Sequence, residues 1–189
     1  MPRSVDHELR RSAVCDAVVD IARARGFAAV TFRSVAQDIG ASTSAVTHYF
    51  RSRDELLSVA VRREVGQRRS ELEAAIHGRT GPDAVRAVID WCVVGAGGAA
   101  QQFWLALLVG AATEPVVSAA LTEFDASWDE LVSGILHAGE GTAEDKTALV
   151  DSLGVLVDGL TVSALLPGRE LPDARRRQVV DAWLKSLGS

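Results

Sequence analysis

The sequence predicts an all-α protein of about nine helices, in which a three-helix helix-turn-helix domain precedes a C-terminal helical bundle. Hydrophobic residues make up 48% of the 189 residues and aromatic residues only 5%. This composition suits closely packed helices, and apolar residues recur at helical spacing between breaks of Gly and Pro. No segment shows the alternation of apolar and polar residues, bounded by turn dipeptides, that predicts a strand.

The first helix is expected over about residues 6–25, after a mobile arm of residues 1–5, and Gly26 ends it. An apolar stripe along this helix would pack across the next two helices and hold them at a fixed angle. The stripe consists of Leu9, Ala13, Val14, Ala17, Val18 and Ile21.

Residues 31–57, TFRSVAQDIGASTSAVTHYFRSRDELL, predict two short helices joined by a tight turn and the start of a third. Thr31 caps the first of these helices, and Gly40 closes it with a left-handed residue. Ser42 caps the second helix, which is expected from residue 43 to about residue 49.

The two sides of the second short helix differ in chemistry. We expect its inward positions to be Ala45, Val46, Tyr49 and Phe50. Its outward positions carry only small hydroxyl groups and one imidazole, and they are Thr43, Ser44, Thr47 and His48. A second helix that exposes such groups is the layout of a DNA-binding helix-turn-helix.

These residues also carry a family resemblance. The run Thr31-Phe32…Val35-Ala36…Ile39-Gly40…Ser42…His48-Tyr49-Phe50 resembles the DNA-binding domain of the tetracycline-repressor (TetR) family, and the HYF-x-S-[KR]-x-E-L-L ending at residues 48–57 is specific. The resemblance implies a DNA-binding domain over residues 1–52 and a homodimer on a palindromic operator. The chain departs from the family at Ser44, where Gly is usual, and at Thr47, where many members carry Tyr.

The resemblance implies two groups of DNA contacts. Base edges and phosphates would face Ser42, Thr43, Ser44, Thr47 and His48. Docking on the DNA backbone would be fixed by Thr31, Arg33, Tyr49 and Arg53. Phosphate contacts position a protein on the duplex, whereas contacts in the groove specify the sequence.

The charge is unevenly distributed along the chain. Residues 1–69 hold twelve Arg and eight acidic residues, a net charge of +4, and residues 70–189 hold eight basic and 17 acidic residues, a net charge of −9. This asymmetry fits a phosphate-facing module joined to an acidic one, although solvated helix faces produce the same pattern.

The rest of the chain predicts a second helical domain over residues 53–189. A capping box at residues 52–55 begins a connector helix that runs to about residue 77 without a Gly- or Pro-rich linker. The later helices are expected at about 82–95, 100–113, 115–138, 143–166 and from Pro172 onward.

This second half resembles the ligand-binding half of the choline-responsive BetI branch of the same family. The similarity lies in QFWLA at residues 102–106, Glu114-Pro115 and VDGL at residues 157–160. Where BetI-like sequences have an Arg-rich segment on the seventh helix, this chain has FDASW at residues 124–128. The resemblance implies a repressor that a small molecule releases from DNA.

The ligand pocket is expected where aromatic residues on several helices converge, with small residues between them. Its predicted lining is Trp91, Phe103, Trp104, Leu107, Phe124, Trp128, Leu156 and Asp158. Tryptophan rings beside a carboxylate suit a cationic or amine ligand. Alternatively, the tryptophans belong to the core and Asp158 faces solvent or a second subunit.

The apolar face of the eighth helix has two interpretations, which are an intramolecular core and a dimer seam. The family resemblance favours the seam, built with the ninth helix as a four-helix interface. The predicted seam residues are Leu149, Leu153, Leu160, Val180 and Trp183.

The sequence argues against an enzyme and predicts no metal site and no cofactor. The four histidines are scattered, nucleophile motifs are absent, and Asp125 and Asp129 share a helix face as solvated carboxylates usually do. Cys15 and Cys92 are expected to be reduced core thiols. No apolar run reaches 18 residues and no signal region is present, so we expect a cytoplasmic protein without a membrane span.

The expected function is that of a DNA-binding transcriptional repressor. The alternative is a helical protein-interaction or small-molecule-binding protein with a non-functional helix-turn-helix. Arg33, Arg51 and Arg53 beside the second short helix favour the repressor, because they supply the charge that phosphate binding needs.

Overall fold

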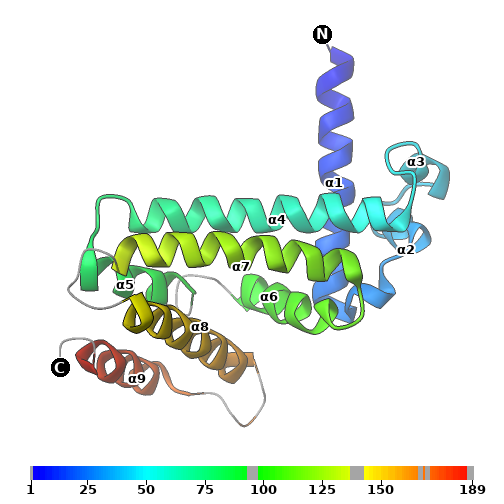
Figure 1. Ribbon diagram of the computed structural model, residues 1–189. Coiled ribbons are helices and arrows are strands. Elements are labelled where there is room, and N and C mark those ends of the chain that lie inside the picture. The colour runs from blue at the N-terminus through cyan, green and yellow to red at the C-terminus, as the bar shows by residue number, and fades with distance from the viewer. Residues whose placement is uncertain (1, 93–97, 137–142, 166–167, 169–170, 187–189) are drawn as a thin grey trace. The chain divides into compact units, whose positions relative to one another are not determined.

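The computed structural model describes residues 2–92, 98–136, 143–165, 168 and 171–186, and all its regular elements are helical. The elements are α1 (Pro2–Arg25), a 3-10 turn η1 (Phe27–Ala29), α2 (Phe32–Asp38), α3 (Thr43–Thr47), α4 (Arg53–Ile76), α5 (Gly81–Asp90), α6 (Gly98–Ala111), α7 (Pro115–Leu136), α8 (Ala143–Leu165) and α9 (Asp173–Ser186) (Figure 1). The nine α-helices in these residues confirm the predicted fold class. The expected ends of the fifth and seventh helices, near residues 95 and 138, lie outside the described part.

The chain divides into two compact units. Unit 1 contains Met1–Arg68 with Phe103–Phe124, and unit 2 contains Arg69–Gln102 with Asp125–Ser189. The boundary predicted between residues 52 and 53 therefore differs from the division in the structure. The first part of α4, most of α6 and the start of α7 belong to the same unit as the helix-turn-helix.

The core of unit 1 explains this division. Buried residues of α1, α2 and α3 share one apolar cluster with Leu56 and Leu57 of α4. Phe103 and Leu107 of α6 belong to the same cluster, as does Val117 of α7. Burial of these apolar side chains is the main contribution to the stability of unit 1. The helix-turn-helix is thus held by α4, α6 and α7 as well as by α1.

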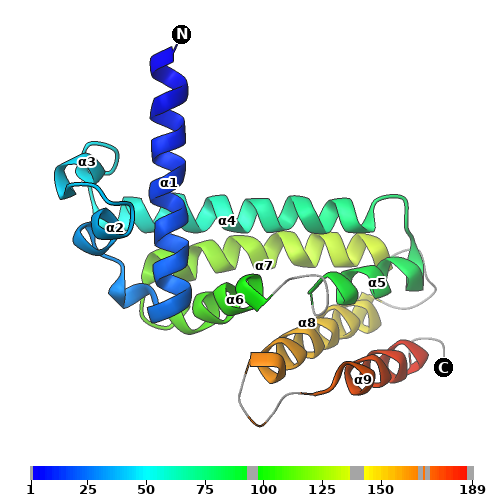
Figure 2. The ribbon, with the colours of Figure 1, turned by 180° about the vertical axis from the view of Figure 1, so that it is seen from behind.

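Figures 1 and 2 both show α1 running across α4 within unit 1. Arg63 of α4 adds a polar link at this crossing, since its guanidinium lies 2.8 Å from the Asp16 carboxylate and donates a hydrogen bond to the Ser12 carbonyl at 3.2 Å. The same guanidinium lies close to the buried Cys15, whose thiol pKa is raised by burial. Cys15 and Cys92 are both buried free thiols, as the sequence predicts.

Helix α1 differs from its prediction in two ways. It begins at Pro2, so residues 2–5 are helical rather than a mobile arm. Val14, Ala17, Val18 and Ile21 are buried as expected, but Leu9 is 65% exposed and Ala13 is also exposed. The apolar cluster of unit 1 contains no α1 residue before Val14, so the buried stripe begins there.

The core of unit 2 lies between α5, α8, α9 and the later parts of α4 and α7, and Figures 1 and 2 both place α8 beside α9. An ion pair between Arg86 and Asp181 links α5 to α9, at 2.5 Å. Asp181 also raises the pKa of the Arg86 guanidinium through that hydrogen bond.

The predicted dimer seam is corrected by this core. Leu153 is fully buried within a single chain, and Leu160 and Val180 are also buried, so none of the three is available to a second subunit. Leu149 and Trp183 remain half-buried. Both sides of α8 carry apolar residues, and the structure turns the Leu153 side inward, leaving Val155 75% exposed on the other side.

Among the described residues, one unbroken helix is long and apolar enough to cross a membrane, judged by length and composition. The window Thr147–Ala164 of α8 has a mean hydropathy of 1.4. Its Leu153 and Leu160 side belongs to the core of unit 2, and core helices of globular proteins pass the same test.

Candidate nucleic-acid interface

Helix α2 starts from a reciprocal cap that the sequence predicted only in part. The Thr31 hydroxyl accepts a hydrogen bond from the Ser34 backbone N–H at 3.0 Å, and the Ser34 hydroxyl accepts one from the Thr31 N–H at 2.9 Å. Serine thus takes the position that Glu or Gln usually fills in a capping box. Two of the orphan N–H groups of the helix start are satisfied, which fixes the entry into the motif.

The turn between α2 and α3 is closed by backbone and side-chain hydrogen bonds. Gly40 has a φ of +64°, and the Ala41 N–H donates to the Ala36 carbonyl at 2.8 Å. This is the helix end that a left-handed glycine allows. Ser42 then caps α3, because its hydroxyl accepts from the Ala45 N–H at 3.2 Å. The predicted caps at Thr31 and Ser42 are both confirmed, and α3 ends at Thr47, about two residues earlier than expected.

Helix α3 presents the polar face that its sequence predicts. Val46 and Phe50 are fully buried, whereas Thr43, Thr47 and His48 are exposed. Ser44 is exposed too, and its hydroxyl lies 2.8 Å from the Ser42 hydroxyl. A Gly at position 44, which is usual in the family that the motif resembles, could not make this contact.

One of the four positions predicted to point inward differs. Ala45 is exposed, so that prediction is wrong, whereas the half-buried Tyr49 packs against the core of unit 1 as expected. The cause is that α1 does not cover the first turn of α3, and Ala45 and Ala13 instead line a pocket between the two helices.

Three rings gather at the end of α3. The ring of His7, on α1, lies 4.7 Å from the ring of Tyr49 and 6.4 Å from that of His48, measured between centroids. The His48 and Tyr49 rings are 5.2 Å apart in an edge-to-face arrangement. This contact joins α1 to the C-terminal end of α3. The place of His7 could not be predicted from sequence, because its partners are more than 40 residues away in the chain.

Arg53 has a different place from the one predicted. We expected it to dock on the DNA backbone, but its guanidinium donates to the carbonyls of Val30 and Phe27 at 2.8 Å each and to both oxygens of Glu114. Four hydrogen bonds inside unit 1 direct this side chain into the protein. We therefore assign Arg53 a structural role that holds the helix-turn-helix in place.

Other arginines of unit 1 have side chains on the surface. Arg33 on α2 and Arg51 after α3 are exposed, and neither guanidinium forms an ion pair among the described residues. Arg11 lies over the Phe50 ring at 5.3 Å, and Arg10 lies beside α3 in the pocket lining. Cations around an exposed hydroxyl face are the arrangement that DNA phosphates require.

The predicted ligand-lining residues fall into two sets, one in each unit. In unit 1, Phe103 and Leu107 are buried, and the half-buried Trp104 ring lies 4.9 Å from the Phe124 ring. The Arg68 guanidinium lies over the Trp104 ring at 5.9 Å. In unit 2, half-buried side chains pack against the core, and they are Trp91, Trp128 and Leu156.

Asp158 is half-buried on α8, and its charge affects the pKa of a carboxylate on α7. The pKa of Asp125 is raised by partial burial, then by the charges of Asp129 and Asp158. Three carboxylates of unit 2 therefore share one electrostatic environment. The Asp125–Asp129 pair follows from helical spacing, whereas its link to Asp158 requires α7 and α8 to be adjacent and is not visible in the sequence. No group of three or more His, Cys, Asp or Glu side chains among the described residues could hold a metal ion.

Comparisons with known proteins match both halves of the chain. Residues 15–60 match the family profile described as bacterial regulatory proteins of the tetR family, and residues 81–189 match the profile of the BetI-type transcriptional repressor C-terminal domain. The chain is 27% identical to the HTH-type transcriptional regulator PksA of Bacillus subtilis, over 99% of this chain and 94% of that protein. It is 26% identical to the regulator BetI of Klebsiella pneumoniae, over 98% and 97%.

Solved structures show the same fold. A transcriptional regulator from a Rhodococcus species superposes with a TM-score of 0.80 at 25% identity, covering 93% of this chain and 94% of that one. A chain from Saccharomonospora viridis, crystallised in complex with choline, superposes with a TM-score of 0.81 at 18% identity, covering 94% and 96%. With the capped helix-turn-helix, these matches show that the protein belongs to the TetR family of transcriptional regulators, as a non-enzymatic repressor with a BetI-type C-terminal domain.

Proposed function

We propose that this repressor binds an imperfect inverted repeat as a homodimer, places one α3 in each major groove, and leaves the DNA when a small organic cation binds its C-terminal half. The observation that supports DNA reading most directly is the exposed hydroxyl and imidazole face of α3, held by caps at Thr31 and Ser42. Side chains of this kind reach base edges when such a helix enters the major groove.

The remaining DNA contacts follow from exposure. Thr43, Ser44, Thr47 and His48 would face the groove, with Ser42 at its edge. Arg33 and the half-buried Tyr49 would meet the DNA backbone, together with the exposed Thr31. Arg51 would add a phosphate contact, in place of the one that we had expected from Arg53.

The test of DNA reading is selection of genomic fragments by the purified protein. An enriched inverted repeat, with half-sites about one helical turn or slightly more apart, is the expected result. Selection without any enriched repeat would favour the alternative, a helical interaction protein whose helix-turn-helix does not function.

We propose that the dimer forms through the outward face of α8 and the adjacent face of α9. Val155 is 75% exposed there, and the exposed Gly159 allows another helix to approach closely. Leu149, Leu156 and Trp183 are half-buried beside this surface or on α9. A two-fold axis would pair the same patch on both subunits.

The dimer surface is tested with one matched pair of variants. Val155→Arg should give a monomer by sedimentation, because it places a charge at the centre of the apolar seam. Val109→Arg makes the same change at a 66% exposed valine on α6 and should leave a dimer. Identical sedimentation of the two variants would reject the α8 surface.

The proposed effector is a small organic cation held by unit 2. Asp125, Asp129 and Asp158 share one environment. The pKa of Asp125 is raised by partial burial and then by the charges of the other two carboxylates, and a bound cation would stabilise its ionised form. Trp128, on α7 with the first two, offers an aromatic face of the kind that binds alkylammonium groups. The BetI-type profile and the choline-bound structure support this class.

Choline is the first probe for this site. Its titration should change tryptophan fluorescence and release operator DNA, and Asp125→Asn and Asp158→Asn should each weaken the response. Glu130→Gln, an exposed acid on the same helix α7, is the control and should respond like the unmodified protein. Equal responses of all three variants would show that these carboxylates do not bind the cation.

A further inference from the structure

The backbone at the end of α3 is fixed, but its side chains need support from outside the helix. Helix α3 has only five residues, and the buried Val46 and Phe50 anchor the backbone on both sides of His48 and Tyr49. The Tyr49 N–H also donates to the Val46 carbonyl at 3.0 Å. These contacts leave the His48 and Tyr49 side chains to turn about their own bonds. Their direction therefore depends on another element.

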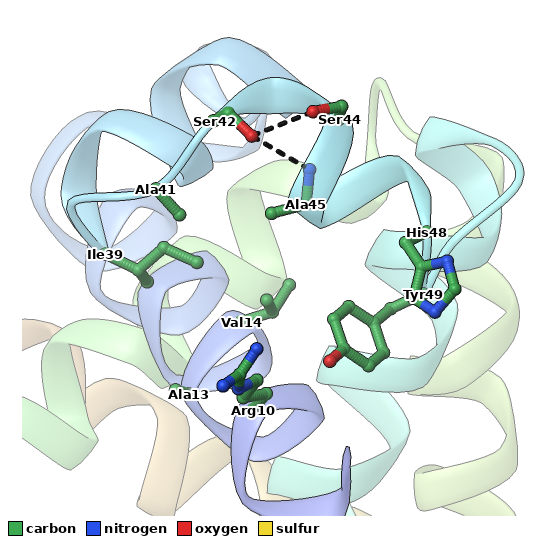
Figure 3. Close-up of a pocket in the computed structure, with 10 residues that line it drawn as sticks. All are labelled: Arg10, Ala13, Val14, Ile39, Ala41, Ser42, Ser44, Ala45, His48 and Tyr49. Atoms are coloured by element: carbon green, nitrogen blue, oxygen red, sulfur yellow. Dashed lines mark hydrogen bonds between the residues drawn. The ribbon is translucent and has the colours of Figure 1, made fainter. Parts of the chain in front are cut away.

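Open space lies beside both side chains. A pocket of about 640 Å³ lies between α1 and the first turn of α3, and His48 and Tyr49 are among its lining residues. Figure 3 shows Tyr49 directed into this pocket, toward α1. A side chain at the edge of such a space keeps several rotamers unless specific contacts select one. Rotamers that are given up only on DNA binding weaken the affinity.

Helix α1 supplies contacts to the end of α3 from one of its faces. His7 and Arg11 are four residues apart and therefore lie on the same side of α1. The His7 ring lies 4.7 Å from the Tyr49 ring and 6.4 Å from the His48 ring, between centroids. One turn further along α1, the Arg11 guanidinium lies 5.3 Å from the centroid of the Phe50 ring. This face of α1 thus contacts three consecutive residues, 48–50.

The contacts of His7 have the geometry of stabilising aromatic pairs. The His7 ring is inclined by 60° to the Tyr49 ring and by 71° to the His48 ring, so neither pair is stacked face to face. Tilted and edge-to-face pairs at such separations are favourable. Since the His48 and Tyr49 rings also meet edge to face, at 82°, the three rings form one cluster, to which α1 contributes His7.

We propose that His7 is a positioning residue for DNA reading. Its ring selects the orientations of His48 and Tyr49 before DNA binds, and it thereby sets the preference for the base pairs that His48 faces. This inference rests on the proposed function, which places His48 at the groove and Tyr49 at the DNA backbone. His7 acts through these two side chains and does not itself touch DNA.

The orientation of the rings is tested first in the protein without DNA. The chain has four histidines, and the imidazole C–H signals of each can be followed in a carbon-edited NMR spectrum. His7→Ala should shift the His48 signals, because it removes one neighbouring ring and lets the Tyr49 ring turn. The signals of His77, in unit 2, should not change. His48 signals that stay in place in this variant would overturn the proposal.

The effect on DNA reading is measured with the operator and its single-base variants. His48→Ala identifies the base pairs whose preference depends on His48. His7→Ala should weaken operator binding about two- to tenfold and reduce the preference at those same base pairs. His7→Phe keeps an aromatic ring and should retain both. The control is His77→Ala at an exposed histidine, which should bind like the unmodified protein. A loss that is equal for all DNA sequences would reject the positioning role.

A direct DNA contact by His7 is distinguished by a double-mutant cycle. His7→Ala should cost less affinity in the His48→Ala background than in the unmodified protein, because part of its effect passes through the His48 ring. Equal costs in both backgrounds, or a His7→Phe variant as weak as His7→Ala, would overturn the proposal. Thermal melts check that the variants fold. A protein that binds no operator would instead contradict the proposed function, and the NMR spectra alone would then decide whether His7 orients the two rings.

Discussion

Arg53 and Glu114, 61 residues apart in the chain, form two parallel hydrogen bonds, Nη1 to Oε2 at 2.8 Å and Nη2 to Oε1 at 2.7 Å. The same guanidinium reaches the carbonyls of Phe27 and Val30. One side chain therefore ties the first turn of α4 to the turn between α6 and α7 and to the segment before α2. Bidentate pairs of this kind fix orientation as well as distance.

The Arg53–Glu114 pair should contribute measurably to stability. A double-mutant cycle with Arg53→Ala and Glu114→Ala should give a coupling free energy of about 1–3 kcal/mol in urea unfolding. The control cycle is Arg62 with Glu123, a pair whose side chains are 57% and 56% exposed. That pair should give less than about 1 kcal/mol. Equal coupling in both cycles would mean that the Arg53 clamp is no stronger than a surface pair.

The same contact makes stability depend on pH. The hydrogen bonds from Arg53 hold the pKa of Glu114 below its ordinary value of 4.5. A carboxyl with a lowered pKa stabilises the fold above its unfolded pKa, and this stabilisation disappears as the pH falls through the folded pKa. The free energy of unfolding should therefore fall more below pH 4.5 in the unmodified protein than in Glu114→Gln. Parallel pH profiles of the two proteins would contradict this.

Gly110 should tolerate no side chain. A Cβ there would lie 2.5 Å from the Phe27 ring, which is itself buried in the core of unit 1. Gly110→Ala should lower the free energy of unfolding by about 1–3 kcal/mol, because the ring must shift. Gly134→Ala, in α7 with open space around it, should instead raise stability by about 0.5–1 kcal/mol. Thermal or urea unfolding of both variants measures the difference.

Specific and non-specific DNA contacts should separate in two variants. Thr47→Ala should change the preference between operator sequences, since Thr47 is exposed on the reading face. Arg33→Gln should weaken all sequences alike and reduce the slope of log K against log salt by about 1. Arg175→Gln, an exposed arginine of α9, should change neither quantity. Electrophoretic mobility shifts at several salt concentrations give both values.

Cation binding in unit 2 should strengthen as the pH rises. The pKa of Asp125 is raised by partial burial and then by the charges of Asp129 and Asp158. This carboxyl therefore ionises at a higher pH than an ordinary aspartate does. A cationic ligand requires the ionised form, and its affinity should therefore increase with pH up to the raised pKa. Calorimetric titration with choline should show this increase in the unmodified protein and a weaker one in Asp125→Asn. An affinity that falls with rising pH would contradict the assignment.

The helix-turn-helix could be predicted from sequence because its determinants are local. Caps at Thr31 and Ser42 and the left-handed Gly40 act within three or four residues, and each is found where the sequence places it. Exposure of Thr47 and His48 follows from helical spacing around the buried Val46.

The role of Arg53 could not be predicted in this way, because its acceptor Glu114 becomes a neighbour only after α6 and α7 pack on α4. Ambiguity of a different kind affected α8. Apolar residues occupy both of its sides, and only the packed core shows that Leu153 points inward and Val155 outward. The exposure of Ala45 could not be predicted, because how much of α3 is covered by α1 depends on the angle at which these two helices pack.

The shared core of unit 1 has a consequence for the synthesis of the protein. Phe103, Leu107 and Val117 are buried together with the residues of the helix-turn-helix, so a nascent chain of 68 residues would expose the surface that they later cover. The helix-turn-helix would reach its full stability only after residue 124, the last residue of unit 1, has left the ribosome. A half-made protein would thus be unable to occupy an operator firmly, and premature termination within α5 would yield a fragment for degradation rather than a constitutive repressor.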